Sequence, residues 1–165
     1  MDHNRRVVTT RLAESTDHAD AVAVWRAANT ARGRPPEATR VDRVRAKLGE
    51  PDAIVIVAVA SGRVRGMLLA EPGRDRDGRG PRVAGLCHIS MVFVHPGWQG
   101  RGVGRLLLER LRTHVAALGG TRLQVWTGAG NERARRLYRR AGFAPSGRLA
   151  SLGPTRPIEQ FTLDL

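Results

Sequence analysis

The sequence Gln99-Gly100-Arg101-Gly102-Val103-Gly104-Arg105 lies between a predicted buried strand and a predicted long helix. A helix starts with up to four backbone N–H groups that lack an intrahelical partner, and Ser, Thr, Asp or Asn usually caps one of them. None of these four residue types occurs from Val94 to Arg105. The three glycines would let an anion approach the backbone, and Arg101 and Arg105 would add positive charge. The stretch therefore predicts a phosphate-binding turn. The alternative is a tight glycine-rich corner whose amides bind water.

Two common nucleotide-binding motifs do not fit this turn. A P-loop requires a Gly-Lys pair followed by Ser or Thr, and the chain contains no Gly-Lys pair. A dinucleotide-binding fingerprint that starts at Gly100 or Gly102 requires a third glycine where Arg105 or Leu107 stands. The turn is therefore predicted to bind phosphate through neither of these two motifs.

The pattern around the turn predicts an α/β (α+β) fold, a mixed sheet of about six to seven strands with helices on both faces. The expected order is β-α-α-β-β-β-α-β-α-β-β. Apolar and β-branched runs predict strands at 6–13, 53–60, 64–71, 86–94, 122–127, 144–149 and 158–163. Helical spacing of apolar residues predicts helices at 17–31, 36–48, 101–118 and 131–141. Residues 91–94 are all apolar, which is typical of a strand in the middle of a sheet, and Gly and Pro at 72–82 predict a mobile loop.

Length and composition predict a single domain over residues 1–165. The longest apolar run, Ala53–Ala60, is far shorter than the ~20 residues that cross a bilayer, so no membrane span is expected. No apolar segment follows Met1–Arg6, and the cytoplasm is the expected compartment. The single cysteine, Cys87, cannot form an internal disulfide, and the five histidines lack metal-ligand spacing, so no metal site is predicted.

Positive charge is concentrated in one third of the chain. The sequence carries 28 Lys and Arg against 15 Asp and Glu, a net charge of +13. Residues 96–150 contain 11 arginines and only two acidic residues, Glu109 and Glu132. A coding bias toward arginine is one explanation, but it does not account for the clustering. The clustering favours an anionic ligand or partner.

Two motifs together resemble the GCN5-related N-acetyltransferase (GNAT) family. The turn Gln99–Gly104 matches the family's Q/R-x-x-G-x-G/A pattern, and Asn131–Phe143 matches N-x-x-A-x-x-L-Y-x-x-x-G-F. The order of the elements matches along nearly all of residues 6–165. The resemblance implies an acyltransferase that uses acetyl-CoA and moves an acetyl group to a primary amine of a small molecule or peptide by direct attack.

The resemblance also implies how acetyl-CoA is bound. Its pyrophosphate would lie on the amides of the turn, its pantetheine arm would pair with the preceding strand, and the helix after Asn131 would form another wall. The residues expected to bind the cofactor are Val92, Phe93, Val94, Gln99, Gly100, Arg101, Gly102, Val103, Gly104, Arg105, Asn131, Ala134 and Tyr138.

Acyl transfer to an amine requires removal of an amine proton, stabilisation of the thioester oxygen and protonation of the CoA thiolate. The resemblance makes Tyr138, the only tyrosine, the general acid; packing in the core is the alternative. The backbone N–H of Val94 is the expected donor to the thioester oxygen. His88, eleven residues before Gln99, stands where some family members have a carboxylate base. A water held by His88 and Ser90, or Glu71, are the other candidates for the base.

Two other functions stay open. A basic nucleic-acid-binding module would use the arginines, but aromatic residues are only 4% of the chain and no RNP-like or helix-turn-helix signature is present. A GNAT-fold protein that binds CoA without turnover is the other. The sequence does not identify the amine acceptor or show that the acyl group is always acetyl. Dimers are common in the family, so a homodimer is also considered.

Overall fold

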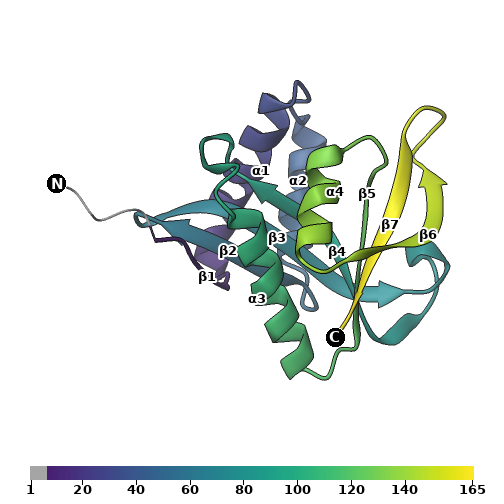
Figure 1. The fold of residues 1–165 in the computed structure, drawn as a ribbon. Helices are drawn as coiled ribbons and strands as arrows, with labels where there is room; N and C mark the ends of the chain where they lie inside the picture. The colour runs from purple at the N-terminus through teal and green to yellow at the C-terminus, as the bar shows by residue number, and fades with distance from the viewer. Residues whose placement is uncertain (1–6) are drawn as a thin grey trace. The chain divides into compact units, whose positions relative to one another are not determined.

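Seven strands form one mixed sheet in the order β1-β2-β3-β4-β5-β7-β6 (Figure 1). The structure is a computed structural model, and it describes residues 7–165. The strands are β1 (Thr9–Leu12), β2 (Ile54–Ala60), β3 (Arg63–Arg74), β4 (Arg82–Val94), β5 (Arg122–Gly128), β6 (Ala144–Ser151) and β7 (Pro157–Asp164). The α-helices are α1 (His18–Ala31), α2 (Ala38–Leu48), α3 (Val103–Ala117) and α4 (Glu132–Arg140). The parallel pairing of β4 with β5 beside antiparallel pairs confirms the predicted mixed α/β fold.

Contacts group the chain into two compact units. Unit 1 comprises Met1–Leu69 and Met91–Arg110, and unit 2 comprises Ala70–Ser90 and Leu111–Leu165. Both β3 and β4 therefore contribute residues to each unit. The single domain over residues 1–165 stays a prediction.

In unit 1, helices cover both faces of the central strands. The apolar stripe of α2, Val41, Val44 and Leu48, is buried with α1 against β2 and β3. On the other face, Gly66 of β3 lies directly beneath α3, which Figure 1 shows in front of the strands. A Cβ added at Gly66 would be 2.8 Å from Val103 Cγ1, so only glycine lets the first turn of α3 pack this closely.

In unit 2, the two faces of the sheet differ in character. Val125 of β5 is paired with Phe161 of β7, and both side chains are buried on the face that α4 covers. Side chains alternate along a strand, so the neighbouring pair of Gln124 and Thr162 lies on the opposite face. That opposite face is polar, and it holds several of the candidate residues described below.

The expected loop at residues 72–82 is shorter in the structure, and its mobility stays a prediction. Strand β3 continues to Arg74, a short 3₁₀ helix covers Arg76–Gly78, and β4 begins at Arg82. The turn is held by backbone hydrogen bonds from Asp75 N to Pro81 O and from Gly80 N to Asp75 O, both 2.9 Å. The glycines and prolines therefore shape a tight hydrogen-bonded connection.

The expected first strand at residues 6–13 is present as β1, although Arg6 lies outside the described residues. Asp17, just before α1, makes no side-chain capping bond to that helix. Its carboxylate instead accepts hydrogen bonds from Arg11 Nη1 at 2.6 Å and Arg11 Nη2 at 3.0 Å. It also accepts from Glu14 N at 2.8 Å, so it ties β1 to the start of the helical region.

Candidate functional site

The glycine-rich turn of unit 1 exposes its backbone. A 3₁₀ helix at Pro96–Trp98 precedes it, and α3 begins at Val103, two residues later than expected. Gly100 and Gly102 have φ angles of 74° and 79°, a left-handed conformation that favours glycine. A Cβ at either position would meet nothing within 4 Å, so the space beside the backbone is open. A ligand can therefore approach the turn without displacing a neighbouring side chain.

The first backbone N–H groups of α3 have no carbonyl partner within the helix. The hydrogen bond from Leu106 N to Gly102 O, 3.1 Å long, reaches back to the turn. The N–H groups of Val103, Gly104 and Arg105 belong to the first turn, where no carbonyl four residues earlier is in helical position. The helix dipole adds partial positive charge at this end. The arrangement suits an anion.

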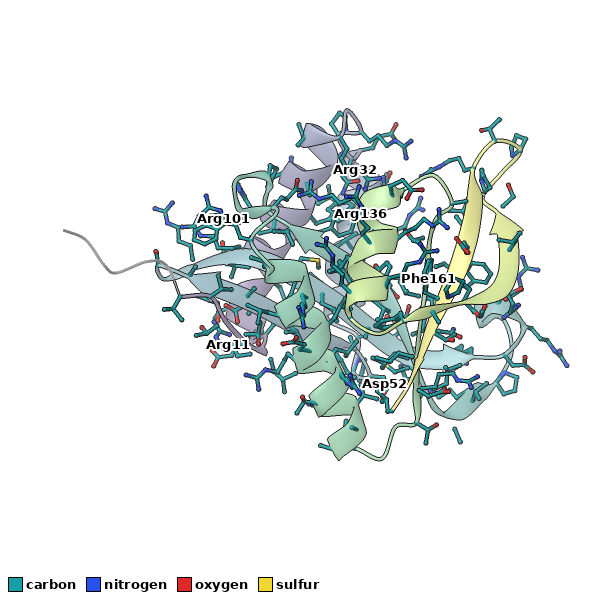
Figure 2. All side chains as sticks on the ribbon, viewed as in Figure 1. Arg11, Arg32, Asp52, Arg101, Arg136 and Phe161 are labelled. Carbon is teal, nitrogen blue, oxygen red and sulfur yellow. The ribbon has the colours of Figure 1, made fainter. Side chains whose placement is uncertain are left out.

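Sequence reasoning missed Trp98, whose ring lies beside Arg101 of the turn. Trp98 is buried, and the guanidinium of Arg101 lies 5.0 Å from its ring centroid. The guanidinium of Arg65 lies 4.8 Å from the same ring. Arg101 is labelled in Figure 2. The contact places a cation beside the turn.

The end of β4 is tied to the turn within unit 1. Gln99 Nε2 donates to Val94 O over 3.3 Å, and His95 N donates to Arg65 O over 2.8 Å. Val92, Phe93 and Val94 are half-buried in the strand. Unit 1 thus brings together the residues expected to bind the pantetheine arm and the pyrophosphate.

The other expected cofactor residues belong to unit 2. Asn131 Oδ1 accepts a 3.2 Å hydrogen bond from Ala134 N and caps α4, which gives the motif asparagine a structural role. Tyr138 is buried, with its ring 5.7 Å from Phe143 and 6.0 Å from Phe161, which is labelled in Figure 2. Burial raises the pKa of Tyr138 above its ordinary value, so the phenol stays protonated at neutral pH.

The Tyr138 hydroxyl has no hydrogen-bond partner among residues 7–165. The ring of Tyr138 packs on Phe143 and Phe161, as the alternative to a catalytic role predicted. Its hydroxyl is available to a ligand. The same helix carries Arg135 as well as the arginines at 136, 139 and 140. Arg135 forms ion pairs with Glu132 at 2.9 Å and with Glu159 at 3.2 Å.

The polar face of unit 2 holds the candidate bases. His88 Nδ1 lies 3.2 Å from Gln124 Nε2. Two residues along β4, Ser90 Oγ donates to Glu71 Oε1 over 2.5 Å. Sequence reasoning missed Gln124. The only available signal was the alternation along β5, which puts this amide on the polar face.

Cys87 lies on the opposite face from His88. Burial, with a smaller contribution from the negative charge of Glu71, raises the pKa of the Cys87 thiol to about 11. A thiol with this pKa is almost fully protonated at neutral pH, so Cys87 is not an activated nucleophile.

Tyr138 and His88 are on opposite faces of the sheet in unit 2. Tyr138 packs on Phe161, which is paired with Val125, whereas His88 is paired with Gln124. Val125 and Gln124 are consecutive in β5 and point to opposite faces. The two candidate proton-transfer groups therefore cannot exchange a proton directly.

A groove of about 700 Å³ opens on the polar face of unit 2. It is lined by Val83, Ala84, Leu86, Thr121, Arg122, Gln124, Ser146, Arg148, Gln160, Thr162 and Asp164.

Among residues 7–165, no helix is both long and apolar enough to cross a membrane. No group of three His, Cys, Asp or Glu side chains placed to hold a metal ion occurs in this part of the chain.

Comparison with known proteins gives a family match. The acetyltransferase (GNAT) family is matched over residues 20–143. An IAA acetyltransferase from Azospirillum brasilense is 34% identical over 114 residues, which is 69% of each chain. A mycothiol acetyltransferase from Beutenbergia cavernae is 42% identical over 57 residues, or 34% of this chain and 19% of that relative.

Solved structures share the fold. The structure of yncA from Salmonella typhimurium with its cofactor acetyl-CoA has a TM-score of 0.72 and 25% identity, covering 96% of this chain and 94% of that one. A GCN5-related N-acetyltransferase from Kribbella flavida has a TM-score of 0.75 and 22% identity, covering 96% and 98%.

Proposed function

The chain belongs to the acetyltransferase (GNAT) family and is an N-acetyltransferase that uses acetyl-CoA, and from this premise we propose that it acetylates a primary amine of a small molecule or peptide by direct attack. One observation in the structure of this chain supports the proposal independently of the family match. The turn at residues 99–105 offers an open backbone, with Gly100 and Gly102 in left-handed conformation, at the start of a long helix.

We propose that the turn binds the pyrophosphate of acetyl-CoA. The first N–H groups of α3 would donate to phosphate oxygens, and Arg101, held against Trp98, would add a charge-assisted contact. Val92, Phe93 and Val94 would bind the pantetheine arm. Asn131, Ala134 and Tyr138 would contribute from α4, as the family resemblance implies.

We propose that Tyr138 is the general acid. The amine nitrogen attacks the thioester carbonyl carbon, the C–S bond breaks, and the leaving thiolate takes the phenolic proton. The phenol holds its proton at neutral pH, and its hydroxyl makes no hydrogen bond to another residue within 7–165, so the proton can be donated to a ligand. Water then returns a proton to Tyr138. The backbone N–H of Val94 is the proposed donor to the thioester oxygen.

The amine loses its proton on the way to the amide. A carboxylate at Glu71, hydrogen-bonded by Ser90, and the imidazole of His88 are the described groups that could accept it, directly or through water. The acceptor's remaining groups would then lie along the polar face of unit 2. Cytoplasmic location and a homodimer are further proposals, which cell fractionation and light scattering would test.

The proposed reaction is tested with a panel of amine acceptors and acetyl-CoA, with release of the CoA thiol as the readout. We expect one class of amines to raise thiol release well above the hydrolysis blank. Thermal stabilisation by acetyl-CoA without release on any amine would instead support a CoA-binding protein without turnover. Stabilisation by an oligonucleotide but not by acetyl-CoA, at the same salt concentration, would contradict the proposal.

A further inference from the structure

Two arginines lie against one buried tryptophan beside the glycine-rich turn of unit 1. The guanidinium of Arg101 lies 5.0 Å from the centroid of the Trp98 ring, and the guanidinium of Arg65 lies 4.8 Å from it. The indole is only 6% exposed, so it is a fixed surface for both flexible side chains. An aromatic ring attracts a cation but does not cancel its charge. Because each guanidinium lies about 5 Å from the same centroid, two positive charges are held within about 10 Å of each other.

No carboxylate compensates these two charges within the described part of the chain. Arg105, at the end of the turn, is paired with Glu109 at 3.0 Å. Arg65 and Arg101 form no ion pair with any of residues 7–165. Like charges at this spacing repel each other, and salt screens them only in part because the Debye length is about 10 Å at an ionic strength of about 0.1 M. An anion bound between them would replace this repulsion by attraction.

The arginines also have hydrogen-bond donors to spare. Arg65 Nε donates to Ala60 O over 3.3 Å, and the carbonyl of Arg65 accepts from His95 N over 2.8 Å. The terminal nitrogens of Arg65, Nη1 and Nη2, make no hydrogen bond to residues 7–165, and neither does the guanidinium of Arg101. A guanidinium fork matches the spacing of phosphate oxygens. Side chains that are already restricted lose less conformational entropy when a ligand binds.

We propose that Arg65, together with Arg101, binds the 3′-phosphate of the CoA moiety and makes the enzyme prefer CoA to dephospho-CoA, which lacks this phosphate. The inference rests on the proposed function, in which the pyrophosphate lies on the amides of the turn. CoA carries one further phosphate, a monoester whose charge is about −2 at neutral pH. Two cations match such a dianion. Arg65 lies outside the turn, and Arg101 has enough donors to contact both phosphate groups.

A role in packing alone predicts a different result. If Arg65 only covers the Trp98 ring, its contribution is to the stability of unit 1 and is the same for every ligand. If Arg65 binds the 3′-phosphate, its contribution is to the difference between two ligands that differ by that phosphate. The experiment therefore compares CoA with dephospho-CoA, and it needs no acetyl transfer.

Calorimetry of the full chain at pH 7.5 measures both affinities. We expect the wild type to bind CoA at least about thirtyfold more tightly than dephospho-CoA, the scale of charge-assisted hydrogen bonds to one group. Arg65→Met removes the charge and keeps an unbranched side chain on the indole. It should reduce the preference to about threefold, by weakening CoA about tenfold while dephospho-CoA changes less than about twofold. Arg101→Met, at an exposed position that tolerates substitution, should reduce the preference as well.

Arg63→Met is the matched control. Arg63 is exposed on the same strand, β3, and has no ring contact or ion pair among residues 7–165, so its replacement removes one charge without touching Trp98. It should keep the wild-type preference. Equal affinities of the wild type for the two compounds would overturn the inference and leave the proposed function standing, because both would still bind. An equal loss of affinity for both compounds in Arg65→Met, or a preference lost equally in Arg63→Met, would also overturn it. Absence of binding of either compound would contradict the proposed function itself.

Discussion

Tyr138 combines a buried ring with a hydroxyl that no described residue engages. We expect Tyr138→Phe to lower kcat by about 10²-fold, the scale of general acid catalysis, because the leaving thiolate loses its proton donor. Affinity for acetyl-CoA should change little, since the ring packing on Phe143 and Phe161 is kept. Stopped-flow or steady-state thiol release gives kcat, and calorimetry gives the affinity. Wild-type turnover in this variant would leave Tyr138 with a packing role alone.

Asp17 gives a pH-dependent prediction for stability. Hydrogen bonds from Arg11 lower the pKa of Asp17 below its ordinary value of 3.8 in the folded chain. A carboxyl group with a lowered folded pKa stabilises the protein above its unfolded pKa, and that contribution is lost as the pH falls through the folded pKa. Asp17→Asn should therefore lower the free energy of unfolding by about 1 kcal/mol at pH 7 and by much less at pH 2 to 3.

Urea unfolding at the two pH values measures this effect. Asp42→Asn, on the exposed side of α2, is the control for removing one negative charge, and it should change the free energy of unfolding little. An equal loss in Asp17→Asn at both pH values would contradict an ionised Asp17 in the folded chain.

At the scale of single elements, the turn before α3 is the most sharply testable feature. Gly102→Asp should weaken acetyl-CoA binding at least tenfold, because it puts a side chain and a negative charge where phosphate is expected. Gly33→Asp is a matched control, since Gly33 also has a positive φ, 72°, with nothing within 4 Å of an added Cβ. The control carries the same strain and charge, so it should bind acetyl-CoA like the wild type. Equal affinities in the two variants, measured by calorimetry, would remove the turn from the binding site.

Elements with a strong local signal were predictable from sequence. The stripe of α2 and the glycines of the turn depend on neighbours within a few residues, and their structures agree with the prediction. Gln124 and Gln160 were not found, because their partners come from other strands and register is not visible in one sequence. The loop at residues 72–82 was predicted too long, because Gly and Pro content alone does not show how far the flanking strands extend.

At the scale of the whole molecule, the net charge of +13 predicts salt-sensitive attraction to any polyanion. Binding of a DNA oligonucleotide should weaken steeply with salt and be lost near about 0.5 M, as counterion release requires. Stabilisation by acetyl-CoA should persist, because backbone pairing and shape also contribute to it. Thermal unfolding at several salt concentrations with each ligand measures both. If the oligonucleotide still stabilised the protein at a salt concentration at which acetyl-CoA no longer did, the nucleic-acid alternative would be favoured.

The separation of Tyr138 and His88 by the sheet of unit 2 determines how hydrogen moves during turnover. In the proposed reaction, the hydrogen lost by the amine and the hydrogen gained by sulfur reach bulk water by different routes. Each cycle must therefore reload the phenol from solvent on the side of α4. In mixtures of light and heavy water, two protons that move in the same rate-limiting step would make the rate a curved function of deuterium content, whereas a single moving proton would make it a straight line.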